Sequence, residues 1–163
     1  MEGKTKTAIS LAIALAIILG WMLWRTDWDS RAIHKTLKSL AELVEKDGSE
    51  STFEALGRGR KVPEFFMENA QIEYLPNRSF RAGDTLSAVF LSARSQVETA
   101  SVRISRHEIM VDAGGRRAES TARVSAQVTV AGGGRHSDSV EYRILWEKVA
   151  GDWRIRLISV IGS

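Results

Sequence analysis

His107 is the side chain of this sequence best placed for proton transfer near neutral pH, because imidazole titrates there. The apolar residues around it change parity along an expected strand: Val102, Ile104, Ile109 and Val111. A β-bulge between Ser105 and Glu108 would restore a single buried face, and bulges often turn a side chain toward a site. Glu108 is adjacent, but consecutive strand residues point to opposite faces. A partly exposed bulge residue is therefore the simpler interpretation of His107.

Other combinations of reactive residues are missing from the sequence. There is no cysteine, which excludes thiolate metal sites, disulfides and a cysteine nucleophile. His34 and His136 do not share a metal-ligand spacing with His107. A glycine-rich phosphate loop, a nucleophile elbow and a zinc-binding HExxH motif are also lacking. We therefore expect neither a metal nor a cofactor.

The charge balance does not indicate a nucleic-acid partner. The 163 residues include 23 Lys and Arg and 20 Asp and Glu, which gives a net charge of +3 with both signs interspersed. The densest basic groups lie at residues 58–61 and at Arg116 and Arg117. We interpret both groups as solvated surface.

The N-terminus has the pattern of a membrane anchor. Residues 8–24 carry no charge and would reach about 26 Å as a helix, which is near the short limit for a hydrocarbon core. Trp21, Trp24 and Trp28 at the outer end are typical of an interfacial belt, and bulky residues there disfavour signal-peptide cleavage. We predict an uncleaved transmembrane helix, with a cleaved signal as the alternative.

The charges beside this run predict its orientation. Lys4 and Lys6 precede it, so the positive-inside rule places the N-terminus in the cytoplasm. The predicted protein is a single-pass inner-membrane protein. Residues 1–29 would form the cytoplasmic tip and the anchor, and residues 30–163 would form a periplasmic or otherwise extracytoplasmic domain.

Helical patterns occupy the first half of that domain. Ser30 is expected to cap a helix that stops at Gly48. A capping box beginning at Ser51 starts a short second helix. After a short strand over residues 71–75, Asp84 is expected to cap a third helix.

Four long strands are expected after Ala100, separated by glycine-containing turns. Phase changes in the first and last of them predict bulges, and long bulged strands cannot lie flat. The apolar stripes of the first and third helices would fill the concave side of the curled sheet. The predicted fold is α+β, with a strongly curved antiparallel sheet wrapped on N-terminal helices.

This order of elements resembles the nuclear transport factor 2-like superfamily, whose fold is also called the cystatin-like cone or SnoaL-like fold. The likeness covers residues 30–161. It is carried by the closing hairpin, Tyr142-Arg-Ile-Leu-Trp-Glu-Lys-Val and Gly151-Asp-Trp-Arg-Ile-Arg-Leu-Ile. The resemblance implies a cone-like α+β barrel. Because the superfamily includes isomerases, dehydratases and many binding domains, the fold does not choose a function.

Enzymes of this superfamily place acid, base and phenol groups inside the cone, as the ketosteroid isomerases do. The resemblance therefore makes six residues candidates for inward-facing groups: His107, Tyr74, Asp84, Tyr142, Glu108 and Ser120. Each has a structural explanation as well. Both tyrosines are in phase with apolar neighbours and suit the core or its rim, and Asp84 suits a helix cap.

Two functions are consistent with this pattern. The preferred hypothesis is a membrane-anchored binding or scaffold domain that acts through a protein partner or a small-molecule ligand, and is not an enzyme. The alternative is a membrane-tethered, cofactor-free isomerase-type or SnoaL-type enzyme. Ionisable groups that converge in an enclosed cavity would favour the enzyme, whereas a cone filled by apolar side chains would favour binding. A homo-oligomer formed through the outer face of the sheet fits either hypothesis.

Overall fold

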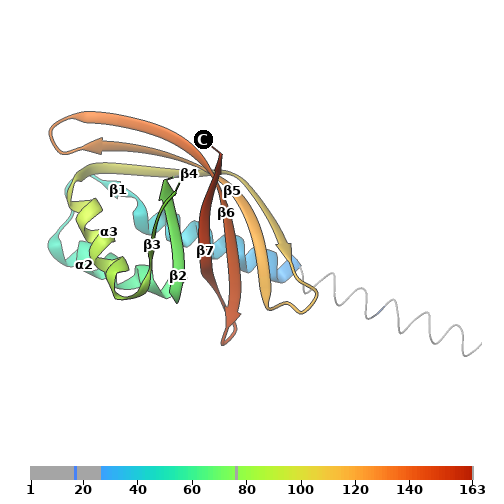
Figure 1. The fold of residues 1–163 in the computed structure, drawn as a ribbon. Coiled ribbons are helices and arrows are strands. Elements are labelled where there is room, and N and C mark those ends of the chain that lie inside the picture. Colours follow the sequence, from blue (N-terminus) through green and yellow to red (C-terminus); the bar gives the residue numbers. More distant parts are fainter. Residues whose placement is uncertain (1–16, 18–26, 76, 163) are drawn as a thin grey trace, which may run out of the picture.

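The computed structural model describes residues 17, 27–75 and 77–162 of the chain (Figure 1). Residues 27–44 are helical and are called the long helix below. The shorter helical elements are α2 (Thr52–Lys61), the 3₁₀ turns η1 (Val62–Phe65) and η2 (Gly83–Thr85), and α3 (Leu86–Ser95). The strands are β1 (Lys46–Asp47), β2 (Phe66–Leu75), β3 (Arg78–Arg81), β4 (Val97–Val111), β5 (Arg117–Val130), β6 (Gly134–Val149) and β7 (Asp152–Gly162).

The predicted anchor, residues 8–24, lies outside the described residues apart from Ile17. Among the helices that the structure describes, none is both long enough and apolar enough to cross a bilayer.

All seven strands form one sheet in the order β1-β4-β5-β6-β7-β2-β3. The four long strands are antiparallel neighbours, as predicted. The prediction of a wholly antiparallel sheet is wrong, because β2 pairs with β7 in parallel. These two strands lie far apart in the chain and no hairpin joins them, so no tight turn fixes their relative direction. Figure 1 shows the long strands bending around the helices.

Both strands predicted to change phase contain a bulge. In β4 the register shifts between Ile104 and Arg106, so Ser105 is the extra residue at the predicted place. In β7 the extra residue is Arg156, one position before the predicted change. As a result, apolar residues on both sides of each bulge face the same core.

The long helix has different ends from those predicted. Residues 27–30 are already helical, so Ser30 is not its cap. The helix ends at residue 44, because residues 46–47 pair with β4 as strand β1. Gly48 then turns the chain with φ at 76°, a conformation that glycine adopts without steric cost.

One of the other two predicted caps is present. At α2 the Glu54 amide donates to Ser51 Oγ at 3.2 Å, and the Ser51 amide donates to Glu54 Oε2 at 2.9 Å, which confirms the capping box. The prediction for Asp84 is wrong. It lies inside η2, and α3 begins after Thr85 without a side-chain cap.

The strand predicted over residues 71–75 is the second half of a longer strand, β2, which pairs with the unpredicted strand β3. With only four residues, β3 is too short to show a hydrophobic period in the sequence.

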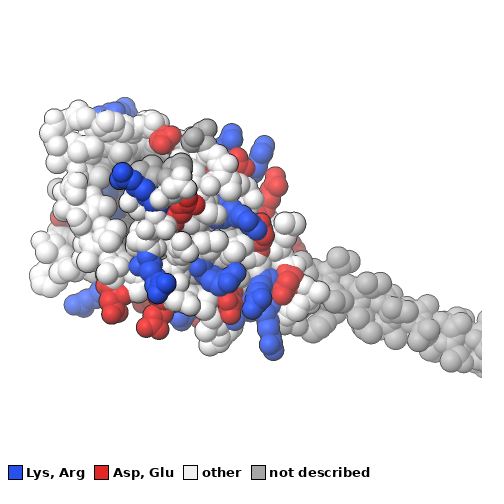
Figure 2. Space-filling view, viewed as in Figure 1, with Lys and Arg blue, Asp and Glu red and all other residues white. Residues whose placement is uncertain are grey.

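The core lies between the concave face of the sheet and the helices. Trp146, Ile144 and Ile155 from the sheet are no more than 2% exposed, and they belong to one apolar cluster with Ile33 and Leu37 of the long helix. The outer face carries ion pairs such as Arg143 with Glu119. Figure 2 shows both signs of charge interspersed on the face it presents.

Candidate functional site

The centre of the cone is filled. Trp146 is 1% exposed, and its indole Nε1 donates to the hydroxyl of Ser120 at 2.8 Å. Ala118 pairs directly with Trp146 across the sheet, and its small side chain leaves room beside the indole ring. The run of small side chains on β5 therefore accommodates a large core residue. This arrangement leaves Ser120 as a hydrogen-bond partner of Trp146.

His107 meets a second histidine at the contact between β4 and the long helix. The Nδ1 atoms of His107 and His34 lie 3.0 Å apart. The Nε2 atom of His107 is buried and has no hydrogen-bond partner among the described residues. An unpaired acceptor is better tolerated there than an unpaired N–H donor, so we assign the Nδ1 proton to His107, which donates to His34.

Burial keeps His107 neutral. Its pKa is lowered to about 4, first because burial penalises the charged imidazolium and second because of the charge of His34. At neutral pH His107 is therefore uncharged in this hydrogen bond. A buried, unprotonated Nε2 is a proton acceptor, but the structure places no donor of the described chain within bonding distance of it.

The candidate residues do not converge on one site. His107, Ala122 and Tyr142 form one row across β4, β5 and β6, with the buried Ala122 between the two candidates. Burial raises the pKa of Tyr142, and the charge of Asp138 adds to this effect. Tyr74 is 50% exposed on β2, which the sheet order separates from β4 by three strands.

The remaining candidates also have structural positions. Asp84 lies in η2, before α3. Glu108 pairs with Thr121, one position along from His107, and so points to the other face of the sheet.

Asp29 is the buried carboxylate that the sequence did not single out. It is 2% exposed, and its Oδ1 accepts hydrogen bonds from Lys148 Nζ at 2.6 Å and from Trp153 Nε1 at 3.1 Å. Its Oδ2 is buried without a hydrogen-bond partner among the described residues. Asp29 lies at the predicted boundary between anchor and domain. From the sequence alone, this position indicates a charge that flanks a membrane segment. Its partners lie far along the chain, so no local spacing indicates the contact.

Arg94 of α3 closes the C-terminal end of the long helix. Its guanidinium donates to the carbonyls of Leu43, Val44 and Glu45 at 2.8 to 3.1 Å and to both carboxylate oxygens of Glu50. The hydrogen bond from Arg94 lowers the pKa of Glu50, so the pair is ionised at neutral pH. These bonds satisfy helix carbonyls that would otherwise lack partners.

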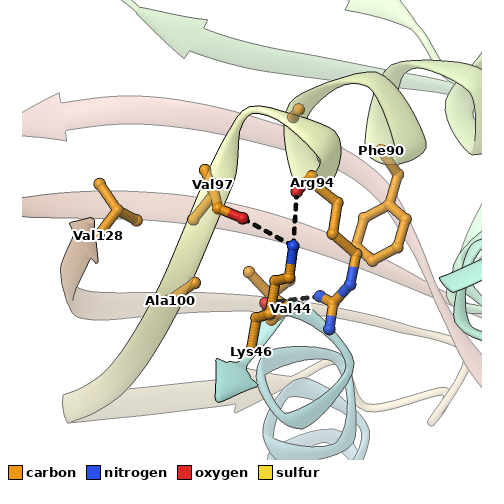
Figure 3. Close-up of a pocket in the computed structure, with 8 residues that line it drawn as sticks. Val44, Lys46, Phe90, Arg94, Val97, Ala100 and Val128 are labelled. Carbon is orange, nitrogen blue, oxygen red and sulfur yellow. Dashed lines mark hydrogen bonds between the residues drawn. The ribbon is translucent and has the colours of Figure 1, made fainter. Parts of the chain in front are cut away.

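An apolar cavity of about 200 Å³ lies beside this clamp (Figure 3). The residues that line it come from the end of the long helix, β1, α3, β4 and β5: Val44, Lys46, Phe90, Ala93, Arg94, Val97, Ala100 and Val128. Lys46 Nζ donates to the carbonyls of Arg94 at 3.2 Å and Val97 at 2.7 Å. Almost all of the lining surface belongs to carbon atoms.

A wider groove of about 790 Å³ adjoins the cavity, because the two share Ala93 and Val97. The groove runs along α3 toward the end of β5, and its other lining residues carry no charge: Thr85, Ala88, Val89, Ser92, Gln96 and Val130. The sequence predicted the apolar stripe of α3 but not this groove, in which Val89 is 44% exposed instead of packed.

The comparisons with known proteins agree with the fold. A family profile described as a SnoaL-like domain matches residues 25–158. Among curated proteins, no sequence matches this chain.

Solved structures with this architecture are distant in sequence. A candidate scytalone dehydratase from Novosphingobium aromaticivorans superposes with a TM-score of 0.67 at 16% identity, over 82% of this chain and 83% of that one. A candidate calcium/calmodulin-dependent protein kinase II association domain from Xanthomonas campestris gives 0.63 at 13% identity, over 82% and 86%. A nuclear transport factor 2-like superfamily protein from Salmonella enterica gives 0.63 at 12% identity, over 83% and 92%.

At these identities the structural likeness establishes the fold alone, and the named relatives include both an enzyme and an association domain. The family profile covers most of the chain and agrees with the curved sheet, the packed helices and the closing hairpin. The chain belongs to the SnoaL-like domain family, within the nuclear transport factor 2-like fold.

Proposed function

We propose that this protein is a membrane-anchored binding domain whose ligand site is the apolar cavity at the end of the long helix. The observation that carries the proposal is the contrast between two places in the cone. The centre is occupied by Trp146, whereas the space beside Val44 and Phe90 is open and apolar. Binding requires such a space, and acid–base catalysis would require ionisable groups around it.

The ionisable groups near the cavity support this assignment. Arg94 and Glu50 neutralise each other, and Lys46 is bound to backbone carbonyls. The candidate acid and base residues His107 and Tyr142 are not among the residues that line the cavity. The cavity therefore has the walls of a binding pocket and lacks a general base.

Benzene, a small apolar probe, tests the proposal by NMR of methyl groups in the full chain. We expect saturable shifts at the methyl groups of Val44, Val97 and Val128, because an apolar cavity of this size takes up such molecules. The methyl groups of Ile144 and Ile155 beside Trp146 should not move. Shifts confined to these two isoleucines would instead place the binding site in the cone centre and overturn the assignment.

A second candidate function is the membrane-tethered SnoaL-type or isomerase-type enzyme. Two observations favour it: the buried Nε2 of His107 and the buried Oδ2 of Asp29, neither of which has a hydrogen-bond partner among the described residues. The names of neighbours such as the candidate scytalone dehydratase are consistent with it. A ligand that shifts the Ile144 methyl in wild-type protein, and whose turnover is lost in His107→Gln, would establish this alternative.

A further inference from the structure

We infer that the cavity takes the hydrocarbon part of an uncharged amphiphile, whose polar group would lie in the adjoining groove. The inference rests on the proposed function, because it assigns a ligand class to the same cavity. It follows from the polarity and charge of the residues that line the cavity and the groove.

The walls of the cavity are apolar. Val44, Phe90, Val97, Ala100 and Val128 present carbon to a space of about 200 Å³. A space with such walls excludes water and favours hydrocarbon, since a polar group placed there loses its hydration without gaining a hydrogen bond. Its size suits a short alkyl chain or a single ring better than a long acyl chain.

The two cationic side chains at the cavity wall are already bound to other groups of the protein. Arg94 is 6% exposed, and its guanidinium donates to Glu50 and to three carbonyls at the end of the long helix. Figure 3 shows the hydrogen bond to the Val44 carbonyl. Lys46 directs its ammonium at two further carbonyls. Because nearly all the lining surface is carbon, both side chains contribute mainly their stems to the wall. An anionic ligand would therefore find no free counter-ion in the cavity.

The groove continues from the cavity at Ala93 and Val97. Its polar side chains are uncharged: Thr85, Ser92 and Gln96. The side-chain nitrogen of Gln96 donates to the carbonyl of Ser92 at 3.3 Å, and its side-chain oxygen accepts no hydrogen bond from the described residues. Such groups suit a hydroxyl, ester or amide, and they do not neutralise a carboxylate or an ammonium.

Three ligands with eight carbon atoms each separate these possibilities: 1-octanol, octanoate and octylamine, titrated into the full chain by calorimetry at neutral pH. We expect octanol to bind at least about tenfold more tightly than either charged analogue, because a charged head group must be desolvated without a partner. Octanoate that binds as tightly as octanol, and loses that affinity in Lys46→Met, would overturn the inference while leaving the binding function intact.

A matched pair of variants ties the affinity to the cavity. Ala93→Leu places a larger side chain where cavity and groove meet and should reduce octanol binding about tenfold or more. Ala113→Leu makes the same change at an exposed residue in the turn between β4 and β5 that lines neither the cavity nor the groove, and should retain binding within about threefold. Circular dichroism confirms that each variant is folded. If none of the three ligands binds wild-type protein saturably, the proposed binding site itself fails, whereas loss of the preference for octanol alone refutes only the ligand class.

Discussion

Burial decides the charge state of His107. The ring lies between β4 and the long helix, where its Nδ1 meets His34 and its Nε2 has no partner among the described residues. The same packing that holds the pair together makes protonation unfavourable. The stability of the domain should therefore respond to pH through this contact.

The pKa of His107 is about 4 in the folded domain and about 6.5 in an unfolded chain, so the unfolded state binds more protons between these values. Its contribution to stability is complete above pH 6.5 and is lost as the pH falls toward 4. After allowance for the partial exposure of the ring, we expect a loss of roughly 2 kcal/mol.

Urea unfolding at pH 7 and at pH 4.5 measures this contribution. In His107→Gln, the difference in unfolding free energy between the two pH values should shrink by most of that amount. His136→Gln is the control, because His136 is exposed on β6. Equal pH dependence in wild type and His107→Gln would show that the histidine pair does not carry the effect.

Single residues differ in how far the sequence reveals their positions. The parity of the surrounding apolar residues predicts a bulge beside His107, and β4 has its bulge at Ser105. Asp29 and Arg94 cannot be found this way, because their partners are distant in the chain: Lys148 for Asp29 and Glu50 for Arg94. Local periodicity predicts the face of a helix or strand on which a residue lies, but it does not predict which distant residue contacts it.

Among the elements, the junction between α3 and the long helix depends most on one side chain. Arg94 binds the end of the long helix and Glu50, and its side chain also forms part of the wall of the apolar cavity. Removing it would leave three carbonyls without their partner and would leave Glu50 with only its ion pair to Arg58, at 3.1 Å. The helix end and the cavity wall would be disturbed together.

Arg94→Met should lower the free energy of unfolding by about 3 kcal/mol, the lower end of the range for a broken buried ion pair, because Glu50 keeps Arg58 as a partner. Arg143→Met is the matched control, since the Arg143 pair with Glu119 is solvent-exposed on the outer face and should contribute little to stability. Chemical denaturation of both variants at pH 7 gives the comparison. Similar losses in the two variants would contradict the role assigned to Arg94.

The elements that were predicted correctly are those with long periodic patterns. The four long strands, their turns and the bulge at Ser105 all follow from alternation over ten or more residues. β1 and β3 have two and four residues, too few to show a period. The parallel pairing of β2 with β7 depends on tertiary packing, which local alternation does not encode.

At the scale of the whole molecule, the distance between the predicted anchor and the domain is short. Trp24 ends the uncharged run, and the long helix is already present at residue 27, so the intervening chain spans at most about 10 Å. Trp28 is 64% exposed near that end of the long helix. A domain held this close to a bilayer would meet amphiphiles partitioned into the membrane, which agrees with the ligand class inferred for its cavity.

A single charged substitution tests the predicted anchor. In the full chain, Leu15→Arg places a cation at the middle of residues 8–24, where insertion becomes less favourable by about 3 kcal/mol. We expect wild-type protein to remain in the membrane pellet after alkaline carbonate extraction, and a large share of Leu15→Arg to be released. Phe53→Arg introduces the same residue at a side chain of α2 that is 89% exposed, and should remain in the pellet.

Alkaline phosphatase fused after Ser163 reports the orientation, because it is active only outside the cytoplasm. Activity of this fusion is expected if Lys4 and Lys6 hold the N-terminus inside. Wild-type protein released by carbonate would refute the anchor, and an inactive fusion on pelleted protein would refute only its direction. The two readouts separate attachment from orientation, since the uncharged run determines the first and the flanking lysines determine the second.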